Sequence, residues 1–219
     1  MPSRTAVLLG ATGLVGGLTL RRLVGDPHWT RVVTLGRRPM PSAGASHAHH
    51  VVDFARLEAY AEVLACDTLF CCLGTTMKQA GSQDAFRHVD YEIPVAAARL
   101  AHRQDARQML AVSALGADAG SRVFYNRVKG ETEDALRAVG FEALHLLRPS
   151  LLTGARDETR LGERVGELVL GAAKPLLIGP LRPLRPTPAA AVARCLAELA
   201  RPMRPGVHVH GPDALRSRA

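Results

Sequence analysis

Three residues in the middle of the chain have the types and spacing of a proton-transfer site. Tyr125 and Lys129 are four positions apart on a predicted helix, so both side chains lie on one face of it. A phenol ionises near pH ~10 in water and acts near neutrality only when a neighbouring cation stabilises the phenolate, and Lys129 can be that cation. Ser113 ends the preceding predicted strand, where its hydroxyl can hydrogen-bond a substrate carbonyl and hold it against Tyr125.

A glycine-rich stretch near the N-terminus predicts the fold that positions these three residues. Residues 6–17 begin as an unbroken apolar run, typical of a strand buried on both faces, and continue as an amphipathic helix. Gly10, Gly13 and Gly16 in between permit a tight turn, a phosphate close to the backbone and close packing of helix on strand. Such a triplet also fits a bare structural turn, but the strand–turn–helix context favours a bound dinucleotide at the helix N-terminus.

The end of the second predicted strand indicates which dinucleotide binds. An NAD site carries an acidic side chain there, which accepts hydrogen bonds from the ribose 2′-hydroxyl. This chain has Arg37 and Arg38 instead, and two guanidinium groups suit a 2′-phosphate. An ordinary exposed basic turn is the alternative, but the pattern favours NADP(H) as the cofactor.

Strand and helix patterns alternate along the chain, which predicts an α/β fold. The expected architecture is a Rossmann-type doubly wound parallel sheet in one domain over residues 1–219, with a small substrate or lid region at about 150–219. We expect strands at 31–35, 50–52, 67–72, 109–113, 143–147 and 206–210, and helices from 14, at 55–64, 84–103 and 121–139, and from Thr187-Pro188 to about 200. Residues 74–82 are expected to form a polar loop. Between the sixth strand and the last helix lie a charged segment at 156–164, an apolar helix to about 173 and a proline-rich stretch at 175–188.

Composition excludes several other classes of protein. The chain has 219 residues, of which 47% are hydrophobic and 22% charged, as in an ordinary soluble globular domain. No apolar run reaches the ~20 residues that span a membrane, and the N-terminal segment is a folding strand rather than a cleavable signal, so we expect a cytoplasmic protein. The net charge of +8 comes from scattered arginines without interleaved aromatics, so no specific nucleic-acid binding is expected.

Neither the cysteines nor the histidines predict a metal site. The four cysteines have no zinc or paired-thiol spacing, which suits buried thiols in a reducing compartment. The histidine-rich run at 46–50 has no cysteine or carboxylate partner at ligand spacing. We therefore interpret this run as a solvated loop that leads into the third strand.

Together these motifs resemble the short-chain dehydrogenase/reductase superfamily, and more narrowly its atypical single-domain branch of Tat-interacting-protein-like oxidoreductases and their bacterial relatives. The superfamily marks are Gly10-Ala-Thr-Gly13-x-x-Gly16, Ser113, Tyr125-x-x-x-Lys129 and Arg148-Pro149. The branch marks are Phe70-Cys-Cys-Leu-Gly-Thr-Thr76, Ser113-Ala-Leu-Gly-Ala-Asp118 and Tyr125-Asn-Arg-Val-Lys-Gly-Glu131. The resemblance extends from the first strand to about Ala200.

The resemblance implies a role for each matching position. Tyr125 is the expected proton donor for carbonyl reduction, Lys129 lowers its pKa and binds the ribose, and Ser113 orients the carbonyl. The implied cofactor contacts are Gly10, Thr12, Gly13, Leu14, Val15 and Gly16 at the pyrophosphate, Arg37 and Arg38 at the 2′-phosphate, Asp53 and Phe54 at the adenine, Leu73, Gly74 and Thr75 beneath the nicotinamide-side ribose, and Pro149 to Leu152 at the nicotinamide amide.

Two departures from the superfamily pattern qualify these expectations. Many members have an asparagine on the helix before the fifth strand, where this chain has Asp90-Tyr91, so a proton relay through that position is not implied. Only about 70 residues follow Pro149, too few for the nucleotide-sugar pocket of the related epimerases.

The predicted function is an NADP(H)-dependent reduction of a small carbonyl substrate. The alternative is a regulatory module that senses the NADP redox state through a protein partner, with the charged segment as a lid or docking surface. The substrate and the oligomeric state, including a homodimer, stay open.

Overall fold

A parallel sheet of seven strands organises the protein, with its strands in the order β3-β2-β1-β4-β5-β6-β9. The structure is a computed structural model and describes residues 4–154 and 179–217. Every neighbouring pair in the sheet runs parallel. The strands are β1 (Thr5–Leu9), β2 (Arg31–Gly36), β3 (His47–Val51), β4 (Thr68–Cys71), β5 (Gln108–Val112), β6 (Ala143–Leu147) and β9 (Gly206–His210). A separate short pair joins β7 (Leu152–Thr153) to β8 (Thr187–Pro188).

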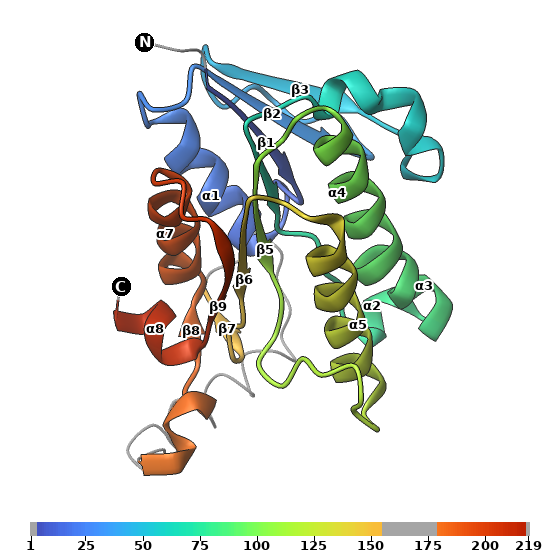
Figure 1. Cartoon of the computed structure of the whole chain (residues 1–219), viewed down its shortest axis with the longest axis vertical. Helices are drawn as coiled ribbons and strands as arrows, with labels where there is room; N and C mark the ends of the chain where they lie inside the picture. Colours follow the sequence, from blue (N-terminus) through green and yellow to red (C-terminus); the bar gives the residue numbers. More distant parts are fainter. Residues whose placement is uncertain (1–3, 155–178, 218–219) are drawn as a thin grey trace.

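Helices cover both faces of the sheet, as Figure 1 shows. One face carries α1 (Leu14–Val24) and α7 (Ala189–Ala200), and the other carries α4 (Ile93–Arg103), α5 (Phe124–Val139) and the 3₁₀ segment η1 (Phe54–Leu64). Shorter elements are α2 (Met77–Ala80), α3 (Gln83–Arg87), the π-helical turn η2 (His88–Glu92), η4 (Gly179–Leu184) and α8 (Pro212–Ser217). This confirms the predicted doubly wound α/β fold and its single domain.

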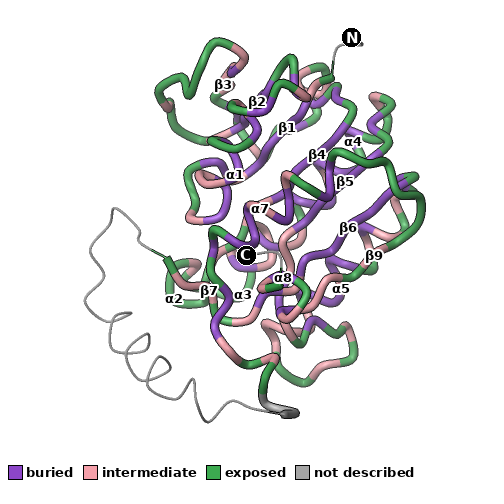
Figure 2. Tube along the Cα trace, turned by 90° about the vertical axis from the view of Figure 1, so that its left-hand side faces the viewer, coloured by how far each residue is buried: buried purple, intermediate pink, exposed green. Residues whose placement is uncertain are grey.

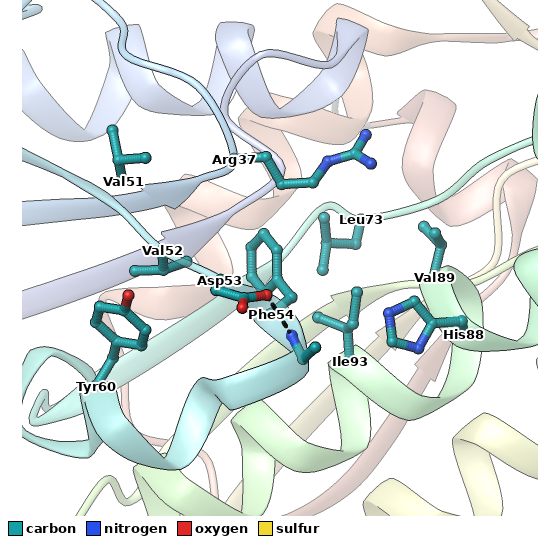
Figure 3. Close-up of a pocket in the computed structure, with 11 residues that line it drawn as sticks. Arg37, Val51, Val52, Asp53, Phe54, Tyr60, Leu73, His88, Val89 and Ile93 are labelled. Carbon is teal, nitrogen blue, oxygen red and sulfur yellow. Dashed lines mark hydrogen bonds between the residues drawn. The ribbon is translucent and has the colours of Figure 1, made fainter.

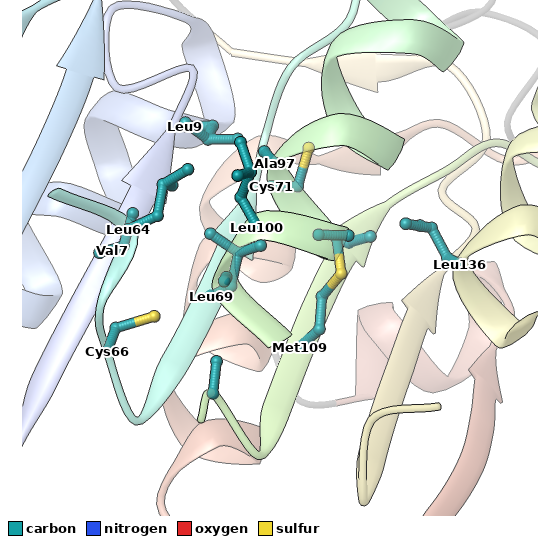
Figure 4. Close-up of a cluster of buried hydrophobic side chains, with 14 of the residues drawn as sticks. Val7, Leu9, Leu64, Cys66, Leu69, Cys71, Ala97, Leu100, Met109 and Leu136 are labelled. Atoms are coloured by element: carbon teal, nitrogen blue, oxygen red, sulfur yellow. The ribbon is translucent and has the colours of Figure 1, made fainter. Parts of the chain in front are cut away.

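Two apolar cores lie on opposite sides of the sheet because successive strand residues face opposite ways. In β1, Val7 and Leu9 pack under α4 and η1, while Ala6 and Leu8 pack under α1 and α7. Figure 4 shows the first of these cores, and Figure 2 shows that the central strands are buried along most of their length. Strands buried on both faces explain why the sequence of β1 reads as continuously apolar.

The strand order reverses beside β1, and this reversal locates the binding crevice. From β1 the chain crosses to β2 on one side, and β4 returns to pair with β1 on the other. In open α/β sheets, ligands bind at such a switch point, outside the carboxyl ends of the strands. The segments that follow β1, β2, β4, β5 and β6 all begin at this edge of the sheet, because the strands are parallel.

The third strand begins earlier than predicted, at His47 instead of His50. His47 and His49 belong to β3 rather than to a solvated loop, and His47 is buried. The reason is that both imidazoles hydrogen-bond the hydroxyl of Thr34 on the adjacent strand β2. An apolar–polar pattern does not reveal such a partner.

The predicted helix at 84–103 is present but is interrupted. It consists of α3, the π-helical turn η2 and α4 in succession. The predicted polar loop at 74–82 contains the short helix α2. A π-helical turn inserts one residue into a helix and often marks a functional position. Here the insertion centres on Asp90, whose side chain is buried.

The start of the last helix also differs from its prediction. Thr187 and Pro188 form β8, and α7 begins at Ala189 without the predicted threonine cap. The Thr187 hydroxyl lies 2.8 Å from Ser150 Oγ instead, so it ties this strand to the loop after β6. The strand at 206–210 is confirmed as β9. The charged segment at 156–164 and the apolar helix to 173 lie outside the described residues.

Candidate active site

The glycine turn after β1 has no room for side chains at two of its three glycines. Gly10 has a φ of +82°, and a Cβ on it would lie 2.6 Å from the carbonyl carbon of Cys72. A Cβ on Gly16 would lie 2.0 Å from the Gly10 carbonyl oxygen, so α1 can approach the turn only without a side chain there. Gly13 is the N-cap of α1, and no side chain of the described residues caps this helix. The first-turn N–H groups of α1 therefore face the crevice, where an anion can bind.

A cavity of about 590 Å³ lies between the segments that follow β2, β3 and β4 and the helical residues around His88 and Ile93. Its lining includes Arg37 after β2, Asp53 and Phe54 after β3, and Leu73 after β4. Figure 3 shows Arg37 across the pocket from Ile93, with the Phe54 ring between them. Asp53 Oδ1 accepts a hydrogen bond of 3.0 Å from the Ala55 N–H, which starts η1. The volume and the mixed lining suit a nucleoside, and four predicted cofactor residues meet here.

Arg37 and Arg38 are both exposed at the end of β2. Among the described residues no carboxylate forms a salt bridge with either guanidinium, so both are available to an anionic ligand. The Arg38 carbonyl oxygen accepts a hydrogen bond from His49 Nε2 at 3.0 Å. The backbone of the arginine turn is thus fixed while the two side chains reach outward.

Lys129 on α5 is a buried cation with a buried partner. Its Nζ lies 2.6 Å from Asp90 Oδ1, and the two side chains are 7% and 0% exposed. Burial alone would lower the pKa of the Lys129 ammonium, but the Asp90 carboxylate, with a smaller effect of the Tyr125 side chain, outweighs it and raises that pKa above its usual value. Lys129 is therefore charged across the physiological range.

Asp90 joins three parts of the crevice. Besides Lys129 on α5, its Oδ2 accepts a hydrogen bond of 2.9 Å from the Thr75 N–H in the loop after β4. The backbone carbonyl of Asp90 lies 2.9 Å from Thr132 Oγ1 on α5. A Cβ on Gly74 would lie 3.6 Å from Asp90 Oδ1, in ordinary contact. Asp90 therefore sets the position of Lys129 relative to the loop at Leu73–Thr75.

Tyr125 lies one helical turn before Lys129 on α5 and is half-buried. Its ring packs on Phe86 of α3, with ring centroids 5.5 Å apart. The charge of Lys129 interacts with the phenol, as the raised pKa of Lys129 reflects. The predicted tyrosine–lysine pair thus lies on one face of α5, one helical turn apart.

Ser113 is engaged with a carboxylate that the sequence reading missed. Its hydroxyl donates a hydrogen bond of 2.6 Å to Oε1 of Glu133, whose side chain is 1% exposed. Arg148 at the end of β6 binds the same carboxylate through two hydrogen bonds of 2.8 and 2.6 Å. Burial alone would raise the pKa of Glu133, but the bonds from Arg148 and Ser113 and the arginine charges hold it below its usual range.

The spacing on α5 contained the signal for Glu133. Tyr125, Lys129 and Glu133 follow one another at intervals of four, so all three share one helix face. Arg148, which belongs to the Arg148-Pro149 motif, supplies the counter-charge of Glu133. The position of Asp90 cannot be predicted, because the π-helical turn that orients its carboxylate cannot be read from the sequence.

The segment after β6 closes the crevice on the other side. The Pro149 carbonyl accepts a hydrogen bond of 2.8 Å from the Leu115 N–H in the loop after β5. Leu152 pairs with Thr187 in the short β7–β8 sheet. The predicted contacts at Pro149 to Leu152 therefore border the same end of the sheet as Ser113 and Tyr125.

The described residues also bear on metal and membrane binding. Within 4–154 and 179–217, no three His, Cys, Asp or Glu side chains are grouped so that they could hold a metal ion. Over the same ranges, none of the helices has the length and apolar character needed to cross a membrane.

Relatives of the chain are found in animals and fungi. It is 33% identical over 176 residues to Protein HTATIP2 of Rattus norvegicus, covering 78% of this chain and 72% of the relative. It is 32% identical over 172 residues to the mitochondrial protein fmp52 of Emericella nidulans (75% and 74%) and 31% identical over 168 residues to mitochondrial FMP52 of Candida albicans (74% and 73%). No family model matches the chain.

Similar solved structures support the fold. MoeE5 in complex with UDP-glucose and NAD superposes with a TM-score of 0.71 at 17% identity, covering 94% of this chain and 74% of that one. A Bacillus halodurans protein described as an NAD-dependent epimerase/dehydratase superposes with a TM-score of 0.67 at 16% identity, with 97% of each chain covered. The second match extends over the full Rossmann-type domain.

The relatives correct one expectation and establish another. The predicted cytoplasmic location is contradicted, because several of the fungal relatives are named as mitochondrial proteins. The predicted family is confirmed by the identity and coverage of the HTATIP2 and FMP52 proteins. The chain belongs to the Tat-interacting-protein-like branch of the atypical short-chain dehydrogenase/reductases, a family of oxidoreductase-type, nucleotide-binding proteins.

Proposed function

We propose that the protein is an NADP(H)-dependent oxidoreductase that reduces a small carbonyl compound to the alcohol. The observation that carries this proposal is the charged, buried Lys129 one helical turn from Tyr125 at the carboxyl edge of the sheet. A buried, charged lysine next to a phenol assists general acid catalysis, because its charge stabilises the phenolate that remains after proton transfer.

The residues around the crevice fit a dinucleotide. The turn at Gly10, Gly13 and Gly16 admits a pyrophosphate against the N-terminus of α1, since a Cβ at Gly10 or Gly16 would collide with backbone. The pocket lined by Asp53 and Phe54 has room for the adenosine half. The remaining proposed contacts are Thr12, Leu14 and Val15 at the turn, Leu73, Gly74 and Thr75 after β4, Lys129 at the ribose, and Pro149 and Leu152 after β6.

The two arginines support NADP(H) over NAD(H). A 2′-phosphate gains charge-assisted hydrogen bonds from Arg37 and Arg38, whereas a 2′-hydroxyl gains little from them. Asp53 does not take the place of the acid in an NAD site, because its side chain is bound to the start of η1.

When bound, the reduced nicotinamide supplies the hydride that the carbonyl carbon receives. Tyr125 donates its phenolic proton to the carbonyl oxygen, which becomes the alcohol hydroxyl. Lys129 stabilises the resulting phenolate until it takes up a proton from solvent and becomes the phenol again. Ser113 orients the carbonyl, turning its hydroxyl from Glu133 to the substrate while Arg148 keeps Glu133 paired.

The substrate pocket in this proposal is small and comes from the loops at this edge. Residues 74–82 and the segment that follows β6, with β8 beside it, border it, within a single domain over 1–219. The substrate class is a small carbonyl compound rather than a nucleotide sugar or a nucleic acid.

A panel of aldehydes and ketones with NADPH or NADH tests the proposal. The expected result is oxidation of NADPH that depends on the carbonyl compound, with NADH used at least about tenfold less well. Binding of neither dinucleotide would overturn the proposal. Equal use of both would overturn the assignment of NADP(H) alone.

A regulatory module that senses the NADP redox state is the second candidate. The bond from Ser113 to Glu133 favours it, because the hydroxyl expected at the substrate points into the protein. Such a module would bind NADPH and NADP⁺ with clearly different affinities and turn over no carbonyl compound. Equal affinity for the two forms would exclude it.

A further inference from the structure

A continuous chain of hydrogen bonds crosses from β3 to the arginine turn. The Ala43 N–H donates to His47 Nδ1 at 2.9 Å, and His47 Nε2 lies 2.8 Å from Thr34 Oγ1. Thr34 Oγ1 also lies 2.9 Å from His49 Nδ1, and His49 Nε2 lies 3.0 Å from the Arg38 carbonyl oxygen. Two side chains of β3 are thus joined through Thr34 of β2 to the backbone beside the two guanidinium groups.

The two ends of this chain fix the direction of every hydrogen bond in it. A backbone N–H can only donate, so Nδ1 of His47 carries no proton and Nε2 of the neutral ring donates to Thr34. A carbonyl oxygen can only accept, so Nε2 of His49 donates and its Nδ1 accepts the Thr34 hydroxyl proton. Each polar atom is satisfied in one arrangement of protons, in which both imidazoles are neutral.

Burial makes this arrangement rigid. Thr34 is fully buried and His47 is 8% exposed. The His49 ring lies against the strand end, because a Cβ on Gly36 would be 3.1 Å from its Cε1 atom. The thioether of Met40 also lies 3.6 Å from the Thr34 hydroxyl, but a thioether is a weak acceptor and competes little.

The hydrogen-bond chain ends at the Arg38 carbonyl, a backbone group beside the proposed cofactor site. The Gly36 carbonyl is already held by the Val52 N–H at 2.9 Å, and His49 holds the Arg38 carbonyl two residues later. The turn that carries Arg37 and Arg38 is therefore anchored on both sides. Arg37 lines the nucleoside-sized cavity.

We infer that His49, held by Thr34 and His47, is a positioning residue that gives the site its preference for a 2′-phosphate. A guanidinium clamp binds a phosphate well only when its backbone is already ordered, since ordering it on binding costs affinity. A cofactor without the 2′-phosphate does not use the clamp, so its affinity depends much less on the order of the turn. This inference rests on the proposed binding of NADP(H).

Dissociation constants of NADPH and NADH for the full chain test the inference. In His49→Ala we expect the Kd of NADPH to rise about fivefold, the effect of one lost hydrogen bond, while the Kd of NADH stays within about twofold. His49→Gln keeps a donor that reaches the Arg38 carbonyl and should restore most of the preference. His50→Ala is the matched control, because the next residue of β3 faces the other side of the sheet.

Each outcome decides between the two proposals. Wild-type protein that binds NADPH no better than NADH would overturn both the assignment of NADP(H) and the role of His49. Wild-type protein that prefers NADPH, with an unchanged preference in His49→Ala, would overturn the inference alone. If His49→Ala does not fold, Thr34→Val is tested instead, because it removes the buried hydroxyl that joins His47 to His49. The same loss of preference for NADPH over NADH is expected from this variant.

Discussion

Ser113 Oγ donates a 2.6 Å hydrogen bond to Glu133 Oε1, so the serine expected to meet the substrate is bound to a buried carboxylate behind it. Glu133 in turn receives two hydrogen bonds from Arg148, which joins α5 to the end of β6. The site is therefore supported by one ion-pair network under Ser113 and a second, Lys129 with Asp90, under Tyr125.

Ser113→Ala removes a hydrogen bond to a charged acceptor and is expected to lower the free energy of unfolding by about 1.5 kcal/mol. Urea denaturation measures this change. A double-mutant cycle with Glu133→Ala, which removes the acceptor, should give a coupling of about 1 kcal/mol between the two residues. Additive effects of the two substitutions would show that the bond contributes nothing to stability.

Arg148→Ala is expected to lower the free energy of unfolding by about 3 kcal/mol, because it leaves the buried Glu133 charge without its main partner. The exposed pair of Arg107 and Glu142, with side chains 65% and 39% exposed, provides the control. Arg107→Ala should cost less than about 1 kcal/mol, as surface ion pairs do. Similar losses in both variants, measured by urea denaturation, would contradict the structural importance of the buried network.

Asp90→Asn keeps an acceptor for the Thr75 N–H but removes the counter-charge of Lys129. Because the folded-state pKa of Lys129 is raised, its stabilising contribution is complete below the unfolded value of about 10.4 and is lost as pH rises through the folded value. At pH 7 the contribution is fully present, so the variant should lose about 3 kcal/mol of unfolding free energy.

Asp134→Asn is the control for that experiment. Asp134 lies on the same helix in an exposed pair with Arg137 and is 63% exposed, so a change under about 1 kcal/mol is expected. A loss in Asp90→Asn no larger than in Asp134→Asn would mean that the buried ion pair does not stabilise the fold.

Acidification is expected to destabilise the protein through His47. Burial and the neighbouring His49 lower the pKa of His47, so its contribution to stability is present above the unfolded value of about 6.5 and is lost as pH falls through the folded value. The urea midpoint of the wild type should fall more between pH 7.5 and pH 5 than that of His47→Asn, whose amide oxygen can accept the Ala43 N–H. The pKa of His28 is also lowered and acts in the same direction, but it is common to both proteins. Parallel pH curves would contradict the prediction.

The fold could be predicted because its signals are local. The apolar run and glycines at 6–17 specify β1, the turn and α1, and alternating patterns specify the rest of the parallel sheet. The tyrosine–lysine pair could be predicted for the same reason, since four residues on a helix are one turn. These features depend on neighbours in the sequence.

The supporting contacts could not be predicted because they join distant elements. Asp90 reaches Lys129 only through the π-helical turn η2, and Ser113 reaches Glu133 only once β5 packs on α5. The sequence predicts a solvated loop for His47 and His49 because their polarity does not reveal their partner, Thr34, on the adjacent strand. The Thr187 cap was wrong because the same hydroxyl has a better partner in Ser150.

Tyr125→Phe tests the central claim most directly, since it removes only the phenolic oxygen and keeps the ring that packs on Phe86. The measurement is the rate of NADPH oxidation with the best carbonyl compound of the panel, together with the Kd of NADPH. The account predicts a loss of turnover of at least about 100-fold, typical of a removed general acid, with the Kd within about twofold of the wild type. Unchanged turnover with normal NADPH binding would contradict Tyr125 as the proton donor.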